Sequence, residues 1–109
     1  MSHPGAGEGG GFSAYVLDQL ASLGGVSSRA MFGGRGLYFE GVFFGILFKG
    51  RLYFKTGPVN RDDYRGMPPF RPNDRQTLKN YREVPAEVLE DADELAAWAR
   101  KAAEARPEG

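Results

Sequence analysis

The sequence predicts a single α+β domain in which an antiparallel β-meander packs with an N-terminal and a C-terminal helix. Apolar residues recur at helical spacing near both ends of the 109-residue chain. Aromatic and branched residues dominate its middle, as in strands. Two turn candidates, Glu40-Gly41 and Lys49-Gly50, divide this middle part into short strands.

The domain is predicted over residues 12–105, between a disordered glycine-rich tail (1–11) and a short C-terminal tail (106–109). The length suits one domain, with an apolar core large enough to fold without disulfides.

The first helix is predicted over residues 13–24. Ser13 is a suitable N-cap, and Gly24 offers a left-handed end. The helix has one apolar stripe: Val16, Leu17, Leu20 and Leu23.

Four short strands are predicted next, over residues 29–32, 36–39, 42–48 and 51–56. Counting outward from two-residue hairpin turns places Gly36 opposite Gly45, and Gly45 opposite Phe54. This register makes both faces of the sheet apolar. One face carries Leu37, Phe39, Val42, Phe44, Ile46, Phe48 and Tyr53. The other carries Tyr38, Phe43, Leu47, Leu52 and Phe54.

The last third of the chain is predicted to contain a loop, an edge strand and a helix. Prolines make residues 58–73 a loop, with one short helix over 60–65, and residues 76–83 add the edge strand. A capping box of Asp91 and Glu94 begins the C-terminal helix. Its buried stripe is Leu95, Trp98, Ala99 and Ala102.

The glycine-rich run MFGGRGLYFEG, residues 31–41, is predicted to be structural. A phosphate-binding loop needs a helix N-terminus after its glycines, and here a strand follows. Bulges, tight turns and close cross-strand aromatic packing are the alternative uses of glycine in a sheet. We assign this role to Gly33, Gly34, Gly36 and Gly45.

No catalytic or metal-binding residues are predicted, and no cofactor. The chain has no cysteine, and its one histidine, His3, lies in the expected tail. Asp62 and Asp63 are adjacent and would point apart. The alternative is an enzyme or small-ligand-binding protein that uses a pocket near Lys55 and Tyr53.

Charge is unevenly distributed, although the net charge is zero. Residues 29–82 carry eleven lysines and arginines against four acids, whereas residues 83–109 carry eight acids against three bases. The two segments either neutralise each other or leave a surface for an anionic partner. Strand aromatics interleaved with cations resemble a nucleic-acid stacking platform, although such aromatics are usually core. The candidate phosphate contacts are Arg29, Arg35, Lys49, Arg51 and Lys55.

Two long segments resemble the N-terminal domain of the TfoX/Sxy competence regulators: SLGGVSSRAMFGGRGLYFEGVFFGILFKGRLYFKT and NYREVPAEVLEDADELAAWARKA. The resemblance implies a bacterial, cytoplasmic α+β domain without catalytic residues. Two-domain members of that family activate natural transformation genes together with the cyclic-AMP receptor protein. The chain looks like a stand-alone N-terminal domain. It is therefore expected to be a regulatory, protein-interaction domain, and no apolar run is long enough to span a membrane.

A homodimer is one of two predicted alternatives; the other is a monomer in which one helix packs on each face of the sheet. If both helices pack on the Phe44 face, the other five apolar side chains form a candidate interaction face that a second copy would cover. These residues are Tyr38, Phe43, Leu47, Leu52 and Phe54.

Direct DNA binding by the domain is expected to be weak and non-specific. The basic segment allows phosphate contacts, but the acidic C-terminal segment competes for the same bases. Titration of duplex and single-stranded DNA at about physiological salt checks this. Sub-micromolar, sequence-selective binding would contradict it.

Overall fold

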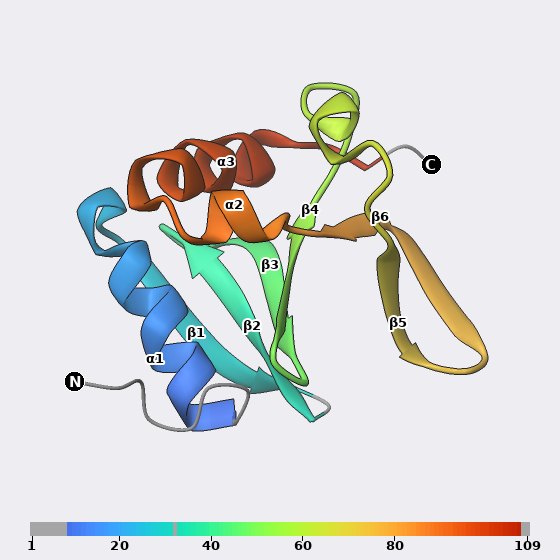
Figure 1. Cartoon of the computed structure of the whole chain (residues 1–109), viewed down its shortest axis with the longest axis horizontal. Helices are drawn as coiled ribbons and strands as arrows, with labels where there is room; N and C mark the ends of the chain where they lie inside the picture. Colours follow the sequence, from blue (N-terminus) through green and yellow to red (C-terminus); the bar gives the residue numbers. More distant parts are fainter. Residues whose placement is uncertain (1–8, 32, 108–109) are drawn as a thin grey trace.

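A computed structural model describes residues 9–31 and 33–107 (Figure 1). The elements follow in the order α1 (Gly9–Gln19), the 3₁₀ turn η1 (Ala21–Leu23), β1 (Val26–Met31), β2 (Gly34–Phe39), β3 (Val42–Phe48), β4 (Arg51–Lys55), the 3₁₀ turn η2 (Arg61–Tyr64), β5 (Pro69–Asn73), β6 (Gln76–Glu83), α2 (Ala86–Leu89) and α3 (Ala92–Glu104).

The strands form one antiparallel sheet in the order β1-β2-β3-β4-β6-β5. The helices pack on one face of the sheet, and the β5–β6 hairpin extends away from them (Figure 1). The predicted α+β class, with a meander and two terminal helices, is confirmed.

Both predicted hairpins have two-residue turns. Glu40 and Gly41 have φ of 49° and 84°, and Lys49 and Gly50 have φ of 50° and 74°. Positive φ at both central positions is typical of the type I′ turn, whose twist matches that of paired strands. Strand β3 has the predicted bounds, and its predicted pairing with β4, including Gly45 opposite Phe54, is confirmed.

The first helix begins earlier than predicted. Helix α1 starts at Gly9, so Ser13 lies inside it and is not its N-cap. Phe12 packs against the core and lies on one stripe with Val16 and Leu20. This packing stabilises the first turn of the helix, where the glycines have low helix propensity. Of the expected tail, residues 9–11 belong to α1, whereas residues 1–8 and 108–109 lie outside the described residues.

The predictions for the region after β4 are partly wrong. Only the end of the predicted loop is a strand: Pro69–Asn73 form the edge strand β5, so β6 lies between β4 and β5 instead of at the edge. Proline is tolerated on an edge strand because one side of that strand needs no N–H donor. Phe70 of β5 is fully buried, which gives this strand its anchor. The short turn η2 and the N-cap bond from the Glu94 amide to Asp91 agree with the prediction.

A β-bulge in β3 changes the register predicted for β2 and β3. Tyr38 pairs with Phe43, but Leu37 pairs with Gly45, so Phe44 is an extra residue with no partner. Gly36 therefore lies opposite Ile46 and not opposite Gly45. One extra residue moves every later side chain of the strand to the other face relative to β2.

The bulge divides the predicted interaction face. Leu47, Leu52 and Phe54 are at most 3% exposed and lie in the helix-covered core with Leu37 and Phe44. Tyr38 and Phe43 stay on the opposite face. The prediction of one continuous five-residue face is therefore wrong. The homodimer stays a prediction, without the surface from which it was argued.

Three of the four structural glycines have close neighbours that a side chain would strike. A Cβ on Gly34 would collide with the Leu47 carbonyl oxygen. On Gly36 it would lie 2.8 Å from the Phe43 ring, and on Gly45 3.0 Å from the Phe54 ring. Gly33 has a φ of 83°. Gly36 and Gly45 therefore let aromatic rings of neighbouring strands lie close against the sheet.

The bulge predicts different responses to truncation at two phenylalanines. Phe54→Ala should lower the free energy of unfolding by about 3–5 kcal/mol, because it leaves a cavity in the core. Phe43→Ala should lower the free energy of unfolding clearly less, because Phe43 is only partly buried. Urea denaturation of both variants measures the difference. Equal losses would contradict the assignment of these residues to different faces.

Candidate functional site

The sheet face opposite the helices contains a second apolar cluster. Ile46, Tyr53 and Phe70 form its buried centre. The Phe70 ring lies 4.9 Å from that of Tyr53 and 5.2 Å from that of Phe48, so β5 closes one end of this face. The other end is covered less completely.

Three half-buried rings form what we call the aromatic row: Tyr38 of β2, Phe43 of β3 and Tyr81 of β6. The ring centroids of Tyr38 and Phe43 are 5.3 Å apart, and those of Phe43 and Tyr81 are 5.8 Å apart. The Arg29 guanidinium lies 5.3 Å from the Tyr38 ring centroid, a cation–π distance. The row therefore crosses the sheet from β1 to β6, with a cation at its β1 end.

The five candidate phosphate contacts do not gather at one place. Arg35 donates a hydrogen bond to Ser28 Oγ (3.1 Å) and lines a pocket with residues of α1 on the helix side. Arg51 forms an ion pair with Glu83 (2.9 Å), which also raises the Arg51 pKa. Lys49 lies over the Phe48 ring and lines the same pocket as Arg35. Arg29 contacts Tyr38 of the row directly. Lys55 lies beside the row because it is the β4 residue that pairs with Tyr81 of β6.

Lys55 and Tyr53 do not share the pocket that the alternative prediction needs. Tyr53 lines a pocket of about 260 Å³ to which Lys55 does not contribute. Burial and the nearby Arg106 lower the Lys55 pKa. Burial, followed by the charge of Glu83, raises the Tyr53 pKa.

A second concave site, which we call the loop pocket, lies between the loop that follows β4 and strand β6. Its volume is about 340 Å³, and its lining comprises Thr56, Gly57, Arg61, Asp62, Tyr64, Arg65, Gly66, Lys79, Asn80 and Arg82. Sequence reasoning missed this site. Its cations are spread over 22 positions and come together only because β6 returns beside the loop.

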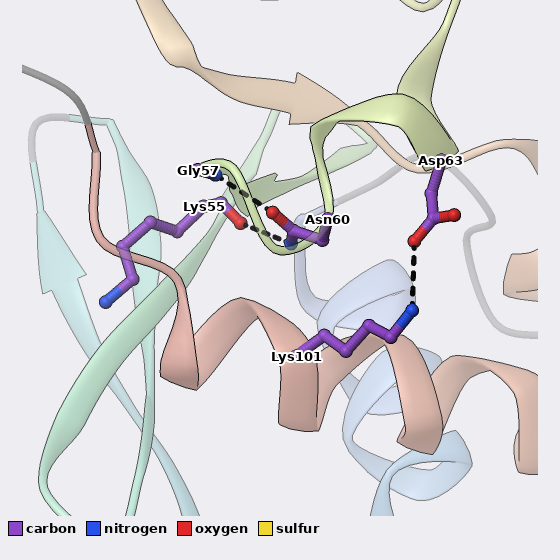
Figure 2. A network of polar contacts seen from close by, with 5 residues as sticks. All are labelled: Lys55, Gly57, Asn60, Asp63 and Lys101. Carbon is purple, nitrogen blue, oxygen red and sulfur yellow. Dashed lines mark hydrogen bonds and ion pairs between the residues drawn. The ribbon is translucent and has the colours of Figure 1, made fainter.

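Asn60 holds the loop in shape (Figure 2). Its side-chain oxygen accepts a hydrogen bond from the Gly57 amide (2.9 Å), and its side-chain nitrogen donates to the Lys55 carbonyl (3.1 Å). Asn60 is 3% exposed, so these bonds are shielded from water. Asp63 ties the same loop to Lys101 of α3 at 3.5 Å (Figure 2).

Tyr64 connects the loop to the core. It is 2% exposed, and its ring lies 4.8 Å from that of Trp98 in α3. Its hydroxyl has no hydrogen-bond partner among the described residues, and burial strongly raises its pKa.

Within the described residues, no group of three or more His, Asp or Glu side chains is arranged to hold a metal ion. No helix in the same part of the chain is long and apolar enough to cross a bilayer.

The structure defines a small α+β domain with an aromatic sheet face and a polar loop pocket. The model of the TfoX N-terminal domain family matches residues 18–106. The chain therefore belongs to this family and is a competence-related domain. The predicted resemblance is confirmed. No curated protein matches the chain.

Asn60→Ala should lower the free energy of unfolding by about 1–3 kcal/mol, because it leaves the buried Gly57 amide without an acceptor. Lys101→Ala removes the more exposed ion pair with Asp63 and should cost less than about 1 kcal/mol. Chemical denaturation of the two variants gives the comparison. An Asn60→Ala loss no larger than that of Lys101→Ala would show that Asn60 does not hold the loop.

Proposed function

We propose that this domain is a non-enzymatic regulatory module of the bacterial cytoplasm that binds a protein partner through the aromatic row. The observation that carries the proposal is the set of half-buried rings on a sheet face without helices, with Arg29 stacked at one end. Family membership supports a link to competence, and contact with the transcription machinery is the form of regulation that we propose.

The composition of the row supports a protein partner. Tyrosine and arginine are enriched among the residues that contribute most to protein–protein binding. Tyr38 and Arg29 are held by strands that pair over six residues, so they lose little further freedom on binding. A rigid aromatic surface with one charged edge can bind a protein with little change of its own shape.

The arrangement of charge favours a protein over a nucleic acid. A stacking platform for single-stranded DNA needs cations along the backbone path beside the rings. Here Arg35 lies on the helix side and Arg51 is paired with Glu83. Of the five candidate cations, only Arg29 and Lys55 lie next to the row, one near each end. Two separate cations do not form a continuous path for a nucleic-acid backbone.

The competing function, an enzyme or a small-ligand binder that uses Lys55 and Tyr53 together, has weaker support. The pocket beside Tyr53 is not lined by Lys55. Proton transfer between a side chain and a substrate requires both to be within hydrogen-bond reach.

Site-specific photocrosslinking in the native cell tests the proposal. A benzophenone amino acid at position 38 should give a discrete crosslinked protein. The same group at position 59 should not, because Val59 is exposed on the loop, away from the row. Mass spectrometry of the product identifies the partner, or a second copy of this chain.

Arg29→Ala and Tyr81→Ala should then weaken binding of the purified partner by about 2 kcal/mol, roughly thirtyfold, because arginine and tyrosine are enriched among the residues that contribute most to binding. Thermal unfolding should show that both variants remain folded. Equal crosslinking at positions 38 and 59, or unchanged affinity in both folded variants, would contradict the aromatic row as the interface.

A further inference from the structure

We propose that the loop pocket binds a small ligand carrying a phosphate group. This site is separate from the aromatic row and does not depend on the proposed protein interaction.

The charge of the pocket supports an anionic ligand. Its lining contains four cationic side chains and one acidic side chain, Asp62. Arg61 and Arg65 come from the loop side, whereas Lys79 and Arg82 come from β6. Cations on two facing walls can contact one phosphate group from both sides, which neutralises its charge better than a single surface cation does.

The one acid lining the pocket is only weakly attracted to its neighbouring arginine. Asp62 contacts Arg65 at 3.8 Å, and both side chains are more than 80% exposed, so their attraction is weak. The adjacent Asp63 does not line the pocket and pairs with Lys101 of α3. The chain thus directs one of two neighbouring carboxylates away from the cationic site.

The backbone of the loop and one of the four cations, Arg82, are held in place without a ligand. The Arg82 guanidinium donates to the carbonyl oxygens of Met67 (3.0 Å) and Lys79 (3.1 Å). These bonds use two of its five N–H groups, so its orientation is fixed while further donors remain. The Asn60 hydrogen bonds hold the opposite wall (Figure 2). Preorganised walls reduce the entropy that binding costs.

The size of the pocket indicates a small molecule. A volume of about 340 Å³ lies near the lower end of small-ligand sites, roughly 300–1,000 Å³. Binding along a nucleic-acid backbone would need an extended cationic stripe instead of one compact cluster. A guanidinium donates two parallel hydrogen bonds to a carboxylate or to a phosphate, but a phosphate group has more oxygens and more charge, so it can accept from both walls at once.

Inorganic pyrophosphate and AMP are suitable probes for isothermal titration of the full chain at about 50 mM salt. We expect saturable binding of at least one probe with a dissociation constant below about 1 mM. In ¹H–¹⁵N spectra of the same titration, the amide signals of Thr56, Gly57 and Asn80 should shift. Trp98, the chain's only tryptophan, contacts Tyr64 of the lining and gives an independent fluorescence signal.

A double variant with Lys79→Gln and Arg65→Gln should bind at least about tenfold more weakly, because each substitution removes a charge-assisted contact. These side chains are exposed, so the variant should fold, and thermal unfolding checks that it does. Arg75→Gln is the matched control: it removes an exposed cation outside the pocket and should leave affinity unchanged.

Three results would overturn the proposal: no saturable binding of either probe, equal weakening by Arg75→Gln, or binding of an oligonucleotide without binding of pyrophosphate or AMP. None of them bears on the aromatic row, whose crosslinking test uses different residues.

Discussion

The arrangement of this domain depends on the contact between the bulge in β3 and Phe54 of β4. Phe44 is the extra residue, and its ring lies 5.4 Å from that of Phe54. Gly45 follows and has no side chain, so Phe54 can lie over it. The bulge therefore places Phe44, Leu47 and Phe54 on the face that already carries Leu37. That face becomes one continuous apolar surface, which the three helices cover.

The same bulge determines what remains on the other face. Phe43 and Ile46 point away from the helices, and no helix of the described chain covers them. The β5–β6 hairpin supplies Phe70, which closes the end near Tyr53 and Phe48. Phe43 and Tyr81 of the aromatic row pack against this closed end, but all three rings of the row stay half-buried. The proposed interface is thus the part of an apolar sheet face that β5 leaves open.

Local signals were sufficient to predict much of the fold. Turn residues gave the two hairpins and the bounds of β3, and Asp91 gave the start of the last helix. The bulge could not be predicted, because both faces of the sheet are apolar and alternation then does not distinguish two registers. Strand β5 was missed because its prolines are typical of loops. Of the candidate site, Tyr38, Phe43 and Arg29 were predicted, whereas the loop pocket was not. The cations of the pocket are far apart in the sequence, and they come close together only because β4 pairs with β6.

Strand β6 contributes to both surfaces, since its neighbouring residues face different ways. Tyr81 belongs to the aromatic row, while Asn80 and Arg82 on either side of it line the loop pocket. The Asn80 carbonyl also accepts a hydrogen bond from the Thr56 amide (2.7 Å), which joins this strand to the loop that Asn60 holds. The backbone that orients Arg82 toward one site therefore orients Tyr81 toward the other. A substitution that displaces β6 must alter both surfaces, whereas one that changes only an exposed side-chain end, as at Lys79, alters the pocket alone.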